Sequence, residues 1–189
     1  MAEVHGLGHS RKRVEDARFI RGKGNYIDDL KLPGMLHLDI VRSPYAHAKI
    51  KCINTEKALA TPGVLAVIDG PTLKNYNVHV MPTLMSDTQM VLPIDTVKYQ
   101  YQEVAAVLAT DRYTAADGVA AVEVDYDPLP VVVDPFKALE PGAPKVRDDK
   151  ESNHIWHWEW GDKANADQDF ANAEVTVKEN IYIPRIHVS

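Results

Sequence analysis

Short runs in which apolar and polar residues alternate recur along the first two thirds of the chain. In residues 35–41, Leu36, Leu38 and Ile40 share one side, and polar residues share the other. This period of two is typical of a half-buried strand, because successive side chains point to opposite faces. Together with compact apolar runs, the same pattern predicts strands at 47–53, 64–68, 103–109 and 122–126.

Helical spacing is rarer than alternation in this part of the chain. Asp111 or Thr110 can cap a helix in which Tyr113, Ala116 and Ala120 recur at helical spacing. Since this helix separates two predicted strands, strand, helix and strand follow one another closely. Two shorter helices are predicted at 55–60 and 71–75, with mostly loop from 69 to 92.

The ends of the chain have a different character. Residues 1–21 are charged and show no sustained period, so we predict an extended arm or a short turn of helix. Glycine, aspartate and proline are dense from 22 to 34, which predicts loops and short strands. Residues 141–153 combine proline and glycine with six charged residues, as expected of a linker at a domain boundary.

The region that follows this linker is predicted to resume regular structure. We expect strands at 154–160 and 173–183, the second continuing to residue 189, and a helix at 162–172 that Phe170 anchors. Pro128 and Pro130 exclude a central strand nearby, although residues 131–133 can pair briefly at an edge. Mixed helices and strands with antiparallel alternation indicate the α+β class.

Composition narrows the class of protein. The 189 residues are 45% hydrophobic and 25% charged, which disfavours wholesale disorder and coiled coil. A net charge of −6 argues against a nucleic-acid or polybasic membrane surface. No run approaches a membrane span, and the first thirty residues lack the apolar core of a secretory signal, so we expect a cytoplasmic protein.

The cysteine count limits the chemistry further. Cys52 is the only cysteine, which excludes an intramolecular disulfide, a cysteine-rich zinc site and a [2Fe–2S] cluster ligated within this chain. Its apolar neighbours Ile50 and Ile53 favour a buried structural thiol over a nucleophile.

Glycine pairs and carboxylate pairs are the next candidates for chemistry. Neither the Gly6 and Gly8 pair nor the Gly22 and Gly24 pair has the strand, third glycine and helix that a phosphate-binding loop requires. Paired aspartates can share acid–base work, but turn-forming neighbours favour bonding to the local backbone. These aspartates are Asp28 with Asp29 and Asp125 with Asp127.

The segment from His154 to Trp160 has the most unusual composition in the chain. On a strand its two histidines, His154 and His157, would point apart, which disfavours a metal pair. Its three tryptophans favour an aromatic ladder or a subunit-contact face. Three methionines, Met81, Met85 and Met90, fit gap filling better than copper ligation.

Longer stretches resemble a known family. RKRVEDARFIRGKGNYIDDLKLPGMLHLDIVRSPYAHAKI (11–50) and QEVAAVLATDRYTAADGVAAVEVDYDPLPVVVDPFKAL (102–139) resemble large subunits of the xanthine dehydrogenase and aldehyde oxidase family of molybdenum hydroxylases. MPTLMSDTQMVLP (81–93) and HIWHWEWGD (154–162) are similar to the carbon monoxide dehydrogenase branch. The resemblance covers essentially the whole chain.

This resemblance implies an N-terminal arm at 1–19, an α/β-hammerhead domain at 20–140, a linker at 141–153 and the truncated start of the first molybdopterin-binding domain at 154–189. It also implies an oxidoreductase whose large subunit carries molybdopterin cytosine dinucleotide, molybdenum and copper. An FAD-binding medium subunit and a [2Fe–2S] small subunit would be its partners.

The family's motifs for the pterin, the copper-binding cysteine and the base glutamate are expected beyond residue 189, and Cys52 does not match the copper-ligand loop. We therefore assign no catalytic, cofactor-binding or metal-binding residue to this chain and expect it alone to be inactive. The alternatives are a relative that acts on an aldehyde or an N-heterocycle, and a non-catalytic scaffold module.

Overall fold

The computed structural model describes residues 8, 12–83 and 88–183. Its strands are β1 (His37–Arg42), β2 (Ala48–Asn54), β3 (Val64–Asp69), β4 (Val80–Met81), β5 (Gln89–Met90), β6 (Thr96–Val97), β7 (Glu103–Ala109) and β8 (Glu123–Pro128). The helices are α1 (Asp16–Phe19), η1 (Ile27–Asp29), α2 (Glu56–Leu59), α3 (Gly70–Asn75), α4 (Arg112–Ala121), η2 (Lys137–Leu139) and α5 (Lys163–Asn172).

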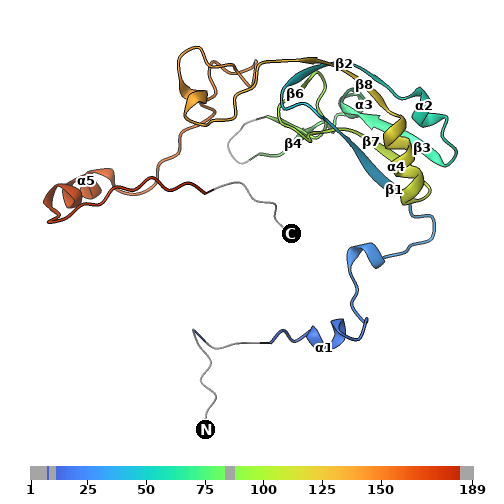
Figure 1. Cartoon of the computed structure of the whole chain (residues 1–189), viewed down its shortest axis with the longest axis horizontal. Helices are drawn as coiled ribbons and strands as arrows, with labels where there is room; N and C mark the ends of the chain where they lie inside the picture. Colours follow the sequence, from blue (N-terminus) through green and yellow to red (C-terminus); the bar gives the residue numbers. More distant parts are fainter. Residues whose placement is uncertain (1–7, 9–11, 84–87, 184–189) are drawn as a thin grey trace, which may run out of the picture.

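Two antiparallel sheets organise the described residues. Sheet A has the order β1-β7-β3, sheet B has the order β6-β2-β8, and β4 pairs with β5. Helix α4 connects β7 in sheet A to β8 in sheet B, and α2 and α4 lie beside sheet A (Figure 1). The segment before β1 and the segment that carries α5 extend away from the two sheets. The α+β class predicted from the pattern is confirmed.

The alternating and helical patterns of the central region predicted its elements well. The strands predicted at 35–41, 47–53, 64–68, 103–109 and 122–126 correspond to β1, β2, β3, β7 and β8. The predicted cap of α4 is also present, because the Asp111 carboxylate accepts hydrogen bonds from the backbone N–H groups of Tyr113 and Thr114, both at 2.9 Å. Local sequence therefore predicts the type and place of these elements, and the strands complete their hydrogen bonds by pairing with distant strands.

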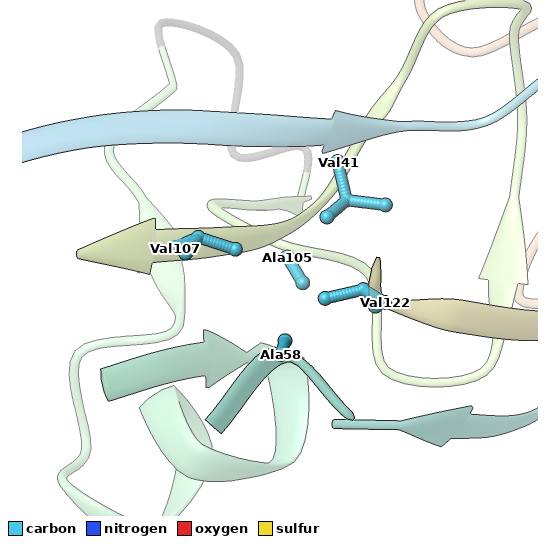
Figure 2. Packing of buried hydrophobic residues seen from close by; sticks show 5 residues of the cluster. All are labelled: Val41, Ala58, Ala105, Val107 and Val122. Atoms are coloured by element: carbon cyan, nitrogen blue, oxygen red, sulfur yellow. The ribbon is translucent and has the colours of Figure 1, made fainter. Parts of the chain in front are cut away.

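The core lies between α4, α2 and sheet A. Val41 of β1, Ala105 and Val107 of β7 and Ala58 of α2 form one buried cluster together with Val122 (Figure 2). A second cluster joins β7 to sheet B through Ala48, Val97 and Val104. Partly buried Ile53 and Val124 contact both clusters, so the two sheets share one continuous apolar interior.

Three predictions beyond residue 128 are wrong for the described residues. Residues 131–133, 154–160 and 173–183 are extended but form no strand, and residues 184–189 lie outside the described part of the chain. The helix predicted at 162–172 is present as α5, but its proposed anchor Phe170 is 69% exposed. A strand requires a neighbouring strand for its backbone hydrogen bonds, and the described residues offer none to these segments.

The N-terminal segment confirms the prediction of a short helical turn within an arm. Helix α1 has four residues, and η1 follows where the glycine-rich loop was predicted, although no strand forms there. Gly22 has a φ of +66°, a turn conformation. Gly24 lies beside the stacked rings of Phe19 and Tyr26, whose centroids are 5.7 Å apart. In the part of the chain that is described, no helix is long and apolar enough to cross a membrane.

Gly118 sets how closely α4 approaches sheet A, and this contact can be tested. A Cβ atom at Gly118 would lie 2.7 Å from Cγ1 of Val107 and 2.9 Å from Cγ2 of Val64. We expect Gly118→Ala to lower the free energy of unfolding by about 1–2 kcal/mol, because overpacking outweighs the gain in helix propensity. Urea denaturation measures this change. If the variant is instead stabilised, α4 does not pack at the observed distance.

Tyr101 provides a second test of stability. Its φ of +65° lies in the left-handed region, which a non-glycine residue adopts at a cost, and its side chain is 66% exposed. We expect Tyr101→Gly to raise the free energy of unfolding by about 0.5–1 kcal/mol as this strain is relieved. Asn77, with a φ of 61°, is the matched control. Asn77→Gly should gain less, because asparagine tolerates this conformation better, and an equal gain would argue against the explanation.

Candidate functional site

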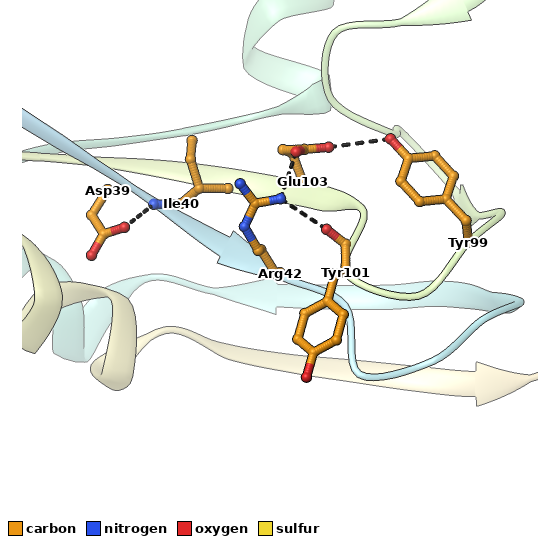
Figure 3. A network of polar contacts seen from close by, with 6 residues as sticks. All are labelled: Asp39, Ile40, Arg42, Tyr99, Tyr101 and Glu103. Carbon is orange, nitrogen blue, oxygen red and sulfur yellow. Dashed lines mark hydrogen bonds and ion pairs between the residues drawn. The ribbon is translucent and has the colours of Figure 1, made fainter. Parts of the chain in front are cut away.

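A polar network closes the end of sheet A where β1 and β7 pair. The guanidinium of Arg42 donates to the backbone oxygen of Tyr101 at 3.0 Å and to Oε1 of Glu103 at 2.5 Å, as Figure 3 shows. The hydroxyl of Tyr99 donates to Oε2 of the same glutamate at 3.2 Å. The network thus fixes the turn that precedes β7 against the last residue of β1.

The protonation states of the groups in this network keep its hydrogen bonds in place, as a structural role requires. Partial burial opposes ionisation of Glu103, but hydrogen bonds from its own backbone, from Arg42 and from Tyr99 lower the pKa of its carboxyl overall. Burial, and then the negative charge of Glu103, raise the pKa of the Tyr99 phenol. At neutral pH the carboxylate is charged and the phenol protonated, so both hydrogen bonds persist. Sequence reasoning missed this network because Arg42 is about sixty residues from the other members, which carry no motif of their own.

A polar-lined cavity lies between α3, the 88–99 stretch and the 141–153 segment. It has a volume of about 370 Å³, and its lining includes Lys74, Asp95, Lys98 and Arg147. Arg147 donates to the backbone oxygen of Thr88 at 3.0 Å and to the two carboxylate oxygens of Asp149 at 2.9 and 2.6 Å. The hydrogen bonds from Arg147 lower the pKa of Asp149 to about 2. The arginine therefore serves to hold the 141–153 segment against the 88–99 stretch.

Asn153 holds the same segment at its other end. Its amide donates to the backbone oxygens of Ala138 and Pro144, at 3.0 and 2.9 Å, and its side-chain oxygen accepts from the N–H of Val146 at 2.9 Å. The 141–153 segment consequently makes contacts within itself and with residues outside it, Ala138 and Thr88.

The first pair of aspartates makes local and surface contacts. The carboxylate of Asp29 accepts a hydrogen bond from the N–H of Tyr26 at 3.0 Å, which is the backbone role expected of a turn aspartate. Asp28 lies 3.7 Å from the guanidinium of Arg112 on α4, which ties the arm to the helix at an exposed position. Neither carboxylate lies in one of the described cavities.

The second pair of aspartates lies on β8, opposite lysines of β2. Asp125 Oδ2 is 3.9 Å from Nζ of Lys51, and Asp127 is the register partner of Lys49. Opposite charges across an antiparallel pair support the pairing modestly. The assignment of no catalytic role to these aspartates stays a prediction.

Cys52 corrects one expectation, because its side chain is exposed. The pairing of β2 with β8 shifts between Ile50 and Cys52, so two residues of β2 are accommodated opposite one of β8. As a result Ile50 and Ile53 both contact the second core cluster, and Cys52 faces away from it. A prediction that assumes uninterrupted alternation along β2 does not include this register shift, and it therefore misplaces the Cys52 side chain.

The histidines and tryptophans at 154–160 also differ from expectation. Because this segment is not a strand, the rings of His154 and His157 approach with centroids 6.2 Å apart instead of pointing apart. Nε2 of His157 lies 2.9 Å from Oε1 of Glu159. All three tryptophans are exposed, and the Trp158 and Trp160 centroids are 6.4 Å apart. A role of this exposed aromatic stretch as a subunit-contact face stays a prediction.

The described methionines and glycines of the sequence analysis lie in short strands and turns. Met81 lies on β4 and Met90 on β5, where each is at least partly exposed. Met85 and Gly6 lie outside the described residues, and Gly8 has a turn conformation with a φ of +84°. Among the described residues, no group of three or more histidine, cysteine, aspartate or glutamate side chains is placed to hold a metal ion.

Comparison with known proteins places this geometry in context. Residues 21–130 match the family described as "Aldehyde oxidase and xanthine dehydrogenase, a/b hammerhead domain". The carbon monoxide dehydrogenase large chain of Afipia carboxidovorans is 54% identical over 99% of this chain. This chain spans 25% of that relative's length.

Solved structures agree with the sequence comparison. A structure of Cu,Mo-CO dehydrogenase in its carbon monoxide reduced state has a TM-score of 0.75 and 55% identity, covering 90% of this chain and 23% of that one. Quinoline 2-oxidoreductase from Pseudomonas putida 86 has a TM-score of 0.66 and 33% identity, covering 77% of this chain and 19% of that one. The chain therefore belongs to the aldehyde oxidase and xanthine dehydrogenase family, whose α/β-hammerhead domain it contains.

Proposed function

We propose that this chain is the N-terminal structural part of a molybdenum-containing large subunit that oxidises carbon monoxide. The reaction is CO + H2O → CO2 + 2H⁺ + 2e⁻, with the electrons passed to an acceptor. The observation that carries this proposal is the 54% identity to a carbon monoxide dehydrogenase large chain along 99% of the sequence. The 33% identity to quinoline 2-oxidoreductase makes oxidation of an N-heterocycle the second candidate.

The cofactor of such a subunit would be molybdopterin cytosine dinucleotide with molybdenum and copper. The described residues do not fit this group, because they bring together no set of three metal-binding side chains and their one cysteine lies on the exposed side of β2. We therefore assign the cofactor to other parts of the large subunit, and derive no reaction step from the residues present here. An FAD-binding medium subunit and a [2Fe–2S] small subunit would carry the electrons onward in the cytoplasm.

Within that subunit we divide the chain into an arm at 1–19, the hammerhead domain at 20–140, a connecting segment at 141–153 and the start of a molybdopterin-binding domain at 154–189. Exposure supports this division, because every residue from 156 to 183 is exposed. Helix α5 has ten residues and buries none of them. A helix this short is marginal without tertiary packing, so its apolar residues fit a role in contact with further protein.

Activity tests the proposal. The test protein is the Afipia carboxidovorans large chain with its matched N-terminal quarter replaced by this sequence, coexpressed with that enzyme's other subunits. We expect this chimera to oxidise carbon monoxide with a redox dye at a rate within about tenfold of the parent enzyme, a barrier change below about 1.4 kcal/mol. This chain alone should show no turnover.

The matched control carries the corresponding segment of quinoline 2-oxidoreductase in the same large chain. Its lower identity should impair packing against the rest of the subunit, and the yield of active enzyme should fall well below that of the first chimera. An assembled first chimera that contains molybdenum yet oxidises quinoline rather than carbon monoxide would favour the second candidate.

The exposed tryptophans give a prediction for the chain on its own. Trp156, Trp158 and Trp160 leave a contact surface uncovered, so we expect the isolated chain to associate at high concentration. Replacing all three by serine should shift the sedimentation profile toward monomer, because buried tryptophans often contribute about 2 kcal/mol or more to contacts. Tyr113→Ser is the control, since it removes an exposed aromatic side chain from α4, outside the tryptophan segment. A clean monomer of the unaltered chain would contradict this prediction.

A further inference from the structure

The two faces of sheet A carry different side chains. Val107 of β7 and Val64 of β3 contact Gly118 of α4, and Val41 of β1 belongs to the same buried cluster. These residues define the inner face, which α2 and α4 cover. The register pairs Leu38 of β1 with Leu108 of β7, and Leu108 with Ala66 of β3.

The opposite face, which we call the outer face of sheet A, carries mainly apolar side chains. Side chains alternate along each strand, so residues one position from the inner ones point outward. Outward positions in register with one another are Leu38 and Ile40 on β1, Ala106 and Leu108 on β7, and Ala66 and Ile68 on β3.

In a sheet that is covered on one face only, the apolar residues of each strand point toward the covering layer. In β1 this arrangement is largely reversed. Before the register shift that precedes Arg42, its inner positions are His37, Asp39 and Val41, whereas its outer positions Leu38 and Ile40 are aliphatic. Figure 3 shows the side chains of Asp39 and Ile40 on opposite sides of the strand. An edge strand that turns its aliphatic residues away from the helices is typical of a sheet with protein on both faces.

Cover on the outer face is incomplete in the described residues. Val104 of β7, which alternation also places outward, packs against Ala48 and Val97 of sheet B. Ala106 is buried, and Gly70 after β3 lies against the backbone of Pro93. Leu38, by contrast, is 57% exposed, and Leu36, just before β1, is 45% exposed. The exposed end of the face therefore lies around Leu38.

The occupant of this exposed end can be argued from chain length. The Afipia carboxidovorans large chain is about four times as long as this chain, which covers 25% of it. Covalently connected polypeptide acts at an effective concentration on the order of millimolar, which favours it over a separate molecule. A second copy lacks this advantage, because it can bind only as a separate molecule.

We propose that the outer face of sheet A, centred on Leu38, is the docking surface for the part of the large subunit that follows this chain. This inference rests on the proposed function and adds which face of the hammerhead domain the remainder of the subunit covers. The helical side of the domain, where α2 and α4 lie, would then remain exposed in the assembled subunit.

Cysteine labelling tests the proposal. With Cys52→Ser as background, Leu38→Cys places a thiol on the outer face, and Leu59→Cys places one on α2, where Leu59 is 50% exposed. Each variant is made in this chain alone and in the chimeric Afipia carboxidovorans large chain. Modification by a maleimide is followed by mass spectrometry.

We expect the thiol at position 38 to react about tenfold or more slowly in the chimera than in the chain alone, because contact excludes the reagent. The thiol at position 59 should react at similar rates in both proteins. Equal rates at position 38 would overturn the proposal while leaving the proposed function intact. Protection at both positions would also overturn it, since the contact would not be confined to one face.

Two further outcomes separate the remaining explanations. If position 38 becomes protected in the chain alone as its concentration rises, a second copy is the occupant and the proposal is wrong. If the chimera without cysteine substitutions yields no folded large chain, the proposed function fails, and the docking surface fails with it.

Discussion

The rest of the fold depends on the burial of β7. This strand is central in sheet A, and five of its seven residues are buried. Ala105 and Val107 pack toward the helices, while Val104 packs against Ala48 and Val97 of the second cluster. A strand buried on both sides must be apolar at successive positions, and the run EVAAVLA meets this requirement. Small residues on β7 and Gly118 on α4 then let the helix approach closely.

The position of β7 also explains why large apolar side chains stay exposed both before β1 and after residue 155. Strong packing around β7 fixes sheet A, sheet B and α4, but it reaches neither the residues before β1 nor those after 155. Both outlying segments still carry large apolar side chains, among them Val14 and Ile20 in the arm and Trp160 and Ile181 in the tail, all at least 83% exposed. Leaving such side chains in water forgoes roughly 1.5–3 kcal/mol each, so their exposure indicates surfaces suited to further protein.

The sequence predicted the central elements because their signals are local. The alternation in β1, the apolar run of β7 and the Asp111 cap of α4 each act over a few residues. Cys52 was misplaced because a register shift in β2 resets the alternation, and alternation alone does not reveal a bulge. The Arg42, Tyr99 and Glu103 network was missed for a related reason, since it joins the end of β1 to the turn before β7 and to Glu103, with no shared motif.

The predictions that failed beyond residue 128 follow the same physics. Alternation of tryptophan with polar residues at 154–160 indicates one side suited to burial, but whether a strand forms depends on backbone partners outside the segment. In this chain those partners are absent from the described residues, and the segment is extended without pairing. Leu38 on β1 shows the same relation, because its side of the strand is apolar although no helix covers it. Hydrophobic pattern thus reports the burial for which a sequence is suited, whether or not the described residues supply that burial.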